Sequence, residues 1–89
     1  MQELELPEIE LDELLTENNS LVVFNDEVNT FDHVIETLMR VCKHSSEQAE
    51  QCTFLIHYKG KCAVKSGDRE VLKPMVEAIC EAGIEARIQ

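Results

Sequence analysis

The sequence predicts a single α+β domain with two layers, in which a three-stranded antiparallel sheet is covered by three helices in the order β-α-α-β-α-β. The 89 residues leave room for one core only. Apolar residues recur at helical spacing in three segments and form short β-branched or alternating runs in three others. Turn residues separate these segments, which is the pattern of a two-layer α+β domain.

The first strand is predicted at Leu21–Phe24, an apolar and β-branched run with polar residues on both sides. A helix follows, with Asn29 or Thr30 as its N-cap. Lys43 and His44 end this helix, where the helix dipole favours positive charge. Its apolar residues lie on one continuous stripe: Phe31, Val34, Ile35, Leu38, Met39 and Cys42.

A second helix is predicted to begin after Ser45, which has capping-box spacing with Gln48. It ends before Gly60, a residue suited to the left-handed conformation at helix C-termini. Its buried face is expected to hold Ala49, Cys52, Thr53 and Ile56, widened by Phe54 and Leu55.

The second strand is predicted at Lys61–Lys65, closed by Ser66 and Gly67. Pro74 complicates the last helix, because a proline in a helix interior costs about 3 kcal/mol and one backbone hydrogen bond. We therefore expect a loose turn at 68–72 that leads into a helix at 73–82. The inward residues of this region are expected to be Val71, Leu72, Met75, Val76 and Ile79. The last strand alternates Ile84, Ala86 and Ile88 with Glu85, Arg87 and Gln89.

The charge is unevenly distributed along the chain. Residues 1–17 hold seven acids and no base, out of a net charge of −10. We expect 1–18 to be a flexible acidic extension that docks on a partner or only improves solubility, and 19–89 to be the folded domain. The acidic balance argues against nucleic acid and anionic membranes as partners. The sequence has no apolar run near the length of a membrane span and no signal or transit pattern, so a cytoplasmic location is expected.

The four cysteines form no CxxC pair, and each falls in an apolar stretch: Cys42, Cys52, Cys62 and Cys80. We expect them to be reduced and mostly buried. A zinc site built from Cys42, Cys52, His44 or His57 lacks finger-like spacing, so no metal or other cofactor is expected.

Two places combine polar groups with apolar neighbours. Asn25–Glu27 follows the first strand, and His57 follows an apolar run near the end of the second helix. Packing of the first two helices can bring these places together. Asparagine and neutral histidine offer acceptors and aspartate a negative charge, a combination that suits a primary ammonium group. Apolar side chains would line the other end of such a patch: Phe31, Val34, Thr53 and Ile56.

The segments LVVFNDEVNTFDHVI (21–35) and FLIHYKG (54–60) resemble the two signatures of the ClpS family, bacterial adaptors that hand N-degron substrates to a Clp-family AAA+ protease. The resemblance extends over 18–89. It implies a binding module without catalytic activity. It also implies two partners. One is a peptide or protein with Leu, Phe, Tyr or Trp as its first residue, and the other is the N-terminal domain of a Clp AAA+ unfoldase.

The resemblance also implies roles for single residues. Asn25, Asp26 and His57 match the positions that bind the substrate α-ammonium. Glu70 matches a position that docks the unfoldase, and the acidic extension matches the segment that the family uses in delivery. The hydrophobic pocket would consist of Phe31, Val34, Thr53, Ile56 and Ile84.

The chain departs from the family pattern at a few positions. Thr53 stands where Met is frequent, which bears on whether Ile or Val is admitted as the first residue. Asn29 stands where Thr is common, Glu27 replaces a frequent Asp, and Pro74 is unusual.

Two other functions remain open from the residues alone. A small hydrolase could use Cys52 or Cys62 with His57 and Asp26, but Cys52 lies more than a helical turn before His57 and the sequence has no Gly-rich oxyanion loop. A pocketless protein–protein interaction module of the same fold, like the C-terminal domain of the ribosomal stalk protein, is the second alternative. A site that joins Asn25, Asp26 and His57 would separate the adaptor from this module.

Overall fold

The sheet has three antiparallel strands in the order β2-β1-β3 in the computed structural model, which describes residues 19–89. β1 (Asn19–Phe24) is the central strand, and β2 (Lys61–Gly67) and β3 (Ala86–Ile88) form the two edges. The predicted element order and the antiparallel sheet are confirmed. The expectation of a flexible extension at 1–18 lies outside the described residues.

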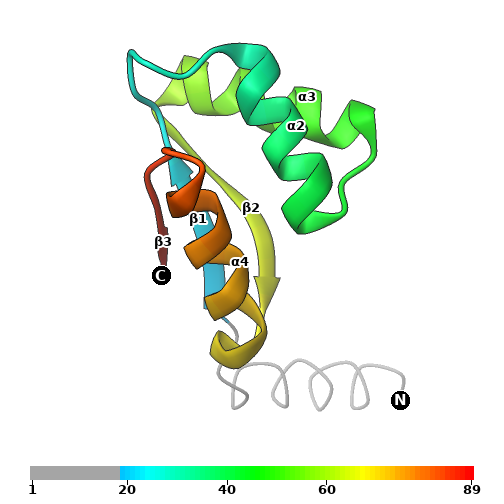
Figure 1. Cartoon of the computed structure of the whole chain (residues 1–89), viewed down its shortest axis with the longest axis vertical. Coiled ribbons are helices and arrows are strands. Elements are labelled where there is room, and N and C mark those ends of the chain that lie inside the picture. Colours follow the sequence, from blue (N-terminus) through cyan, green and yellow to red (C-terminus); the bar gives the residue numbers. More distant parts are fainter. Residues whose placement is uncertain (1–18) are drawn as a thin grey trace, which may run out of the picture.

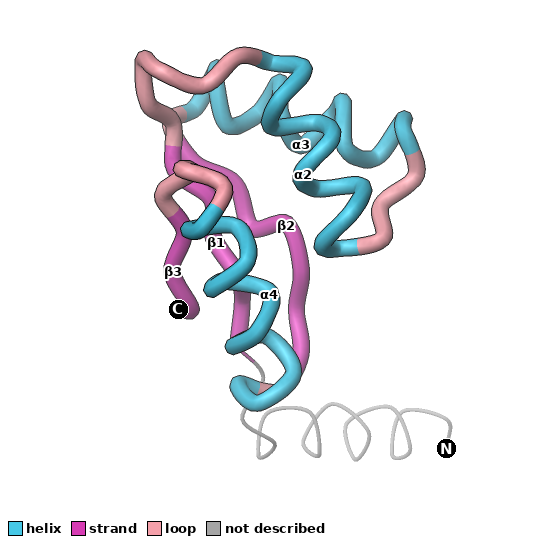
Figure 2. Tube along the Cα trace, in the orientation of Figure 1, coloured by secondary structure: helices cyan, strands magenta, loops and turns pink. Residues whose placement is uncertain are grey.

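Three helices pack against this sheet. α2 (Phe31–Cys42) and α3 (Ser46–Lys59) lie together at one end of the molecule, and α4 (Arg69–Glu81) runs along the sheet (Figure 1). The connections are short, and the loop that joins β1 to α2 leads across to the end of α3 (Figure 2). Among residues 19–89, no helix is long and apolar enough to cross a membrane.

The first two helices begin where the sequence predicts. The Thr30 hydroxyl accepts a hydrogen bond from the His33 N–H at 3.1 Å, so Thr30 rather than Asn29 is the N-cap of α2. Ser45 and Gln48 form the expected reciprocal capping box of α3. Gly60 ends α3 with a φ of 93°, a conformation that glycine adopts without strain.

The two longer strands exceed their predicted lengths. Asn19 pairs with Gly67 and Ser20 with Ser66, so both pairs extend the ladder. The register shifts between Leu21 and Val22, where β2 carries one extra residue, Val64. His44 Nε2 donates a hydrogen bond of 2.8 Å to the Val64 carbonyl. From the sequence, His44 was considered at the helix C-terminus and as a zinc ligand, and this hydrogen bond was not predicted.

The expected turn at 68–72 is wrong, because α4 already begins at Arg69 and contains Pro74. Leu72 lies in the first turn of α4 and is fully buried in the core. Burial of a leucine side chain contributes roughly 1.5–3 kcal/mol, which offsets much of the cost of one proline. Pro74 lies near the N-terminus of α4, where its missing N–H leaves only the exposed Glu70 carbonyl without its helical partner.

The buried faces are narrower than their apolar patterns suggest. Phe54 and Leu55 were expected to widen the buried face of α3, but they are 57% and 41% exposed. Val71 is also exposed, whereas Thr37, a polar residue outside the predicted stripe, is buried. The core is formed by the inner face of the sheet and one side of each helix: Leu21, Val23, Leu38, Cys42, Ala49, Ile56, Leu72, Ile79 and Ile84.

The last strand and the cysteines also differ from expectation. β3 begins at Ala86, so Ile84 precedes the strand, although it is buried. All four cysteines are free thiols, but only Cys42 is fully buried and Cys80 is exposed. Within the described part of the chain, no group of three His, Cys, Asp or Glu residues is arranged to hold a metal ion.

Candidate functional site

The end of α3 and the end of β1 are joined by backbone hydrogen bonds at Gly60. The Gly60 N–H donates to the Ile56 carbonyl at 2.9 Å and closes the helix. The Gly60 carbonyl in turn accepts a hydrogen bond of 2.8 Å from the Asn25 N–H. Because His57 lies in the last turn of α3, this connection brings His57 and Asn25 to the same end of the molecule.

The Asp26 carboxylate is held by hydrogen bonds from its own loop. Its Oδ1 accepts from the N–H groups of Val28 and Asn29, each at 2.9 Å, and its Oδ2 accepts from Asn29 Nδ2 at 2.7 Å. The backbone N–H of Asn29, followed by that of Val28 and by the Asn29 side chain, lowers the pKa of Asp26 below its usual 3.8. Asp26 is therefore an oriented negative charge at neutral pH.

Asn29 ties this loop to the rest of the fold. Its Nδ2 also donates to the Gly83 carbonyl at 2.8 Å, across the turn that follows α4. From the sequence, Asn29 was expected only as a helix cap and as a departure from a family pattern, and its bond to Gly83 was not predicted. The Asp-x-x-Asn spacing signals only the bonds between Asp26 and Asn29, because Asp and Asn side chains often bond the backbone of their own turn.

A cavity of about 480 Å³ lies between this loop, α2 and α3. It unites all three residues expected to bind an ammonium group with four of the five expected in the hydrophobic pocket. Its lining comprises Asn25, Asp26, Glu27, Asn29, Thr30, Phe31, Val34, Thr53, Ile56 and His57. Ile84, the fifth pocket residue, is buried in the core and is not part of this lining. Glu70 lies on the first turn of α4, outside the cavity, and is exposed.

His57 stands at the junction of the polar and apolar ends of the cavity. Its ring is exposed and contacts Phe31 edge to face, with 5.3 Å between the ring centroids. None of the hydrogen bonds between residues 19–89 uses the His57 ring, so its nitrogens are available to a ligand. Val34 and Ile56 line the apolar end and are also buried in the core. This end is therefore a fixed wall.

Thr53 forms part of the same wall. Its side chain is buried, and its hydroxyl donates a hydrogen bond of 2.7 Å to the Ala49 carbonyl in the preceding turn of α3. The hydroxyl proton is therefore used within the helix. Toward the cavity, Thr53 acts as a small side chain rather than as a hydrogen-bond donor.

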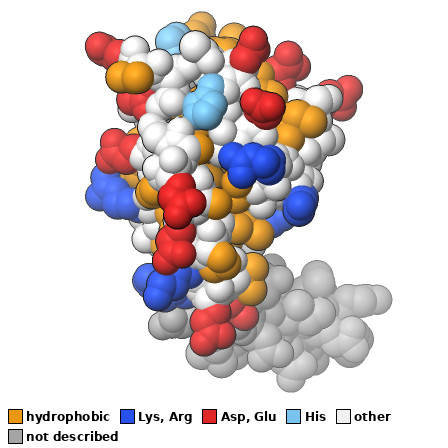
Figure 3. Space-filling model, viewed as in Figure 1, with side chains coloured by type: hydrophobic (Ala, Val, Ile, Leu, Met, Phe, Trp, Pro, Cys, Tyr) orange, Lys and Arg blue, Asp and Glu red, His pale blue; other side chains and the backbone are white. Residues whose placement is uncertain are grey.

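A second, shallower hollow lies next to the cavity, on the outer side of α2 and α3. Its volume is about 630 Å³, and Phe31 lines both spaces. The exposed Phe54 and Leu55 belong to this hollow, with Asp32 and Glu50 beside them. Acidic side chains gather over this end of the molecule (Figure 3). The surroundings of the cavity therefore favour a cation.

The half-buried Cys52 thiol, which precedes Thr53 in α3, is unsuited to nucleophilic chemistry. Burial, reinforced by the neighbouring Cys62, raises the pKa of Cys52 to about 11. A thiol with this pKa stays protonated at neutral pH, whereas a cysteine nucleophile reacts as the thiolate.

Comparisons with known proteins agree with this architecture. The family model for the ATP-dependent Clp protease adaptor protein ClpS matches residues 16–86. The Clp protease adapter protein ClpS of Thermosynechococcus vestitus is 34% identical over 68 residues, which are 75% of this chain and 72% of the relative. The ClpS of Corynebacterium aurimucosum is 32% identical over 83 residues, 91% of this chain and 75% of the relative.

A solved structure shows the same fold. It is that of Agrobacterium tumefaciens ClpS2 bound to L-phenylalaninamide, with a TM-score of 0.75 and 19% sequence identity. The match covers 81% of this chain and 94% of that protein. The family model spans most of the present sequence, and relatives above 30% identity span more than two thirds of it. The chain therefore belongs to the ClpS family of adaptor proteins of the ATP-dependent Clp protease.

Proposed function

We propose that this adaptor binds the free α-ammonium and the bulky apolar first residue of N-degron substrates and delivers them to a Clp AAA+ unfoldase. The observation that carries the proposal is the composition of one cavity, in which Asn25, Asp26 and His57 face the same space as an apolar wall. L-phenylalaninamide, which the Agrobacterium ClpS2 binds, has the matching pair of groups, an α-ammonium and an apolar ring.

The two ends of the cavity contribute differently to affinity. Burial of the first side chain against Val34 and Ile56 supplies roughly 1.5–3 kcal/mol. Each charge-assisted hydrogen bond from the ammonium adds about 1.5–3 kcal/mol before desolvation is subtracted. After the entropy lost on association, a Kd of about micromolar is expected.

The alternatives receive less support. A pocketless interaction module does not account for a cavity in which the Asp26 carboxylate and the His57 ring lie with apolar side chains. A cysteine hydrolase does not suit a Cys52 thiol that stays protonated at neutral pH. Capture of a free N-terminus uses Asn25, Asp26 and His57 together with the apolar wall.

Fluorescence anisotropy with labelled peptides that differ only in the first residue tests the proposal. Phe, Leu, Tyr and Trp are expected to bind at about micromolar Kd, and Ala, Ser and Asp to bind at least about tenfold more weakly. N-acetylation removes the charge and leaves buried polar groups without partners, so it is expected to weaken binding by about 100-fold or more. Equal binding of free and acetylated peptides would contradict the proposal.

A second surface is proposed to bind the unfoldase. Glu70 is exposed in the first turn of α4, and its position outside the cavity allows both partners to bind together. Glu70→Arg is expected to weaken binding to the N-terminal domain of a Clp unfoldase in a pull-down, while the peptide Kd stays unchanged. An unchanged pull-down would remove Glu70 from the docking surface.

A further inference from the structure

A groove of about 470 Å³ lies between α4 and the edge strand β3, outside the peptide cavity. Its apolar lining includes Val76 and Ile88, and Arg69 and Lys73 lie one helical turn apart on its α4 side. Both cations are exposed, and neither forms an ion pair with another residue of 19–89. The groove therefore combines apolar and basic side chains in a chain whose net charge is −10.

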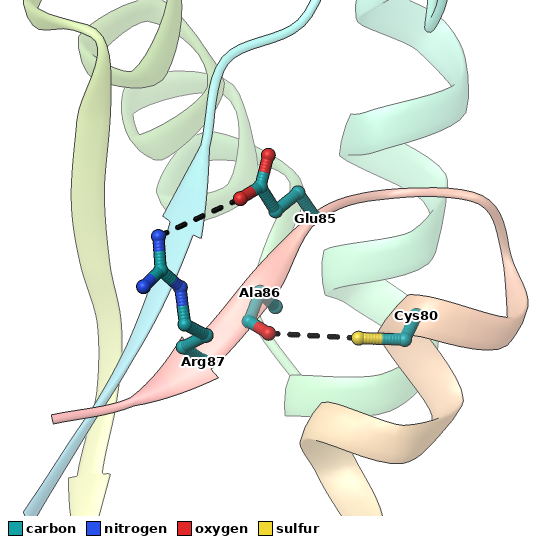
Figure 4. A network of polar contacts seen from close by, with 4 residues as sticks. All are labelled: Cys80, Glu85, Ala86 and Arg87. Atoms are coloured by element: carbon teal, nitrogen blue, oxygen red, sulfur yellow. Dashed lines mark hydrogen bonds and ion pairs between the residues drawn. The ribbon is translucent and has the colours of Figure 1, made fainter.

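The free edge of β3 forms one side of this groove. Ser20 and Gln89 exchange two backbone hydrogen bonds of 2.8 and 2.7 Å. In an antiparallel ladder such pairs alternate with outward-facing residues, so the amide and carbonyl groups of Ala86 and Ile88 point away from β1. The Ala86 carbonyl accepts a hydrogen bond of 3.5 Å from the Cys80 thiol (Figure 4). This edge can accept a further extended segment.

The guanidinium of the third cation of the groove lining, Arg87, is already engaged by neighbouring residues. Arg87 lies on the opposite side of β3 from Cys80 (Figure 4). Its guanidinium stacks on the Phe24 ring at 4.6 Å from the centroid and pairs with Glu85 at 3.6 Å. Arg69 and Lys73 are therefore the cations that an occupant of the groove would meet.

The sequence that precedes β1 has the complementary pattern. Between Glu3 and Asp12, acids at 3, 5, 8, 10 and 12 alternate with apolar residues at 4, 6, 9 and 11, interrupted once by Pro7. Because Pro7 shifts the phase by one residue, the period of two is unbroken only over 8–12, where an extended chain has one acidic face (8, 10 and 12) and one apolar face (9 and 11). The seven residue-to-residue steps from Asp12 to Asn19 span up to about 23 Å, several times the spacing of neighbouring strands.

The position at which the N-terminal segment joins β1 also favours docking in this groove. Asn19 pairs with Gly67, two residues before Arg69, and the neighbouring Ser20 pairs with the end of β3. The chain therefore enters β1 beside the basic end of the groove. A short tether of this kind gives an effective concentration of about millimolar, so a weak contact suffices for docking.

We infer that residues 8–12 of this same chain dock in the groove between α4 and β3. Their apolar face covers Val76 and Ile88, and their acids lie near Arg69 and Lys73. This contact is independent of the peptide site, because no residue lines both the groove and the cavity.

The exposed Cys80 in the groove provides the test. Alkylation of the full-length protein is followed by peptide mass spectrometry, with Cys62 on β2 as the internal control. The variants Ile9→Ser/Leu11→Ser and Glu8→Lys/Glu10→Lys are each expected to raise the Cys80 rate about tenfold at unchanged Cys62 rate, equivalent to about 1.4 kcal/mol of docking. The matched control Leu14→Ser/Leu15→Ser, outside the docking segment, leaves both rates unchanged.

Exchanging the charges of the groove and of the docking segment distinguishes docking from indirect effects of the substitutions on the Cys80 rate. Lys73→Glu is expected to raise the Cys80 rate, and Lys73→Glu combined with Glu8→Lys/Glu10→Lys is expected to restore the low rate. Equal Cys80 rates in all variants, or failure of the combined variant to restore protection, would overturn the inference. Protection that disappears on dilution would also overturn it, because it would identify a second copy of the chain as the occupant.

Discussion

The two ends of the peptide cavity are built in different ways. At the polar end, Asp26 and Asn29 are partly exposed and are positioned by hydrogen bonds within one loop. At the apolar end, Val34, Thr53 and Ile56 belong to two helices and are buried. Changes at the polar end should therefore alter binding with little effect on stability, whereas changes at the apolar end should alter both.

The largest effect is expected for His57→Ala. The ring is exposed and makes no hydrogen bond within residues 19–89, so the free energy of unfolding should change by less than about 0.5 kcal/mol. Loss of one charge-assisted acceptor should raise the Kd of a Phe-first peptide about 10- to 100-fold, measured by anisotropy. Unfolding in urea provides the stability control. If His57→Ala lost stability but bound the peptide normally, the proposed difference between the polar and apolar ends of the cavity would be contradicted.

A smaller effect is expected for Thr53→Met at the apolar end. The longer side chain narrows the cavity, so peptides that begin with Ile or Val should lose about tenfold more affinity than those that begin with Phe. Since Thr53 is buried, the variant should also lose about 1–3 kcal/mol of stability. Thr53→Ser, which retains the hydroxyl that bonds Ala49, is the matched control. Equal losses for all first residues would show that Thr53 does not set selectivity.

The smallest effect, on the pKa of Asp26 and on stability in acid, is expected for Asn29→Ala. This substitution removes the side-chain donor to Asp26. The pKa of Asp26 should rise toward its ordinary value of 3.8, as measured by NMR titration of the carboxyl carbon. Because the folded pKa is depressed, the stability from this charge is present above about pH 4 and is lost as the pH falls through the folded pKa.

The acid-induced loss of stability should consequently be smaller in Asn29→Ala than in the unmodified protein. The comparison is the urea midpoint at about pH 6 and about pH 3. Asp32→Asn, which changes a carboxylate outside the cavity, serves as the control. An Asp26 pKa that did not move would show that the backbone donors alone hold the charge.

Helical periodicity predicted most of the residues at the apolar end of the cavity, but not which apolar residues are exposed. Helical spacing alone places Val34 and Ile56 on inward faces, because the period of an α-helix is independent of the tertiary structure. The same period cannot separate a buried face from a groove, and this is why Phe54 and Leu55 were assigned inward although they are exposed. The start of α4 was misplaced because the burial of Leu72 outweighs the local preference at Pro74.

The polar end depends on contacts between segments that are distant in the sequence. Asn25 and His57 were expected together, and Gly60 provides the hydrogen bond that joins their segments. The bond from Asn29 to Gly83 spans 54 positions, so no local pattern could reveal it. Ile84 alternates correctly for an inward residue, but only the packed structure shows that it faces the core rather than the cavity lining.

The central claim is that the Asp26 charge recognises a free α-ammonium. The most direct test is a cycle of four Kd values, for free and N-acetylated Phe-first peptides on the unmodified protein and on Asp26→Asn. The unmodified protein should prefer the free peptide by about 100-fold, and Asp26→Asn should reduce this preference to about tenfold or less while its affinity for the acetylated peptide stays nearly constant. A preference of the same size in both proteins would contradict the account.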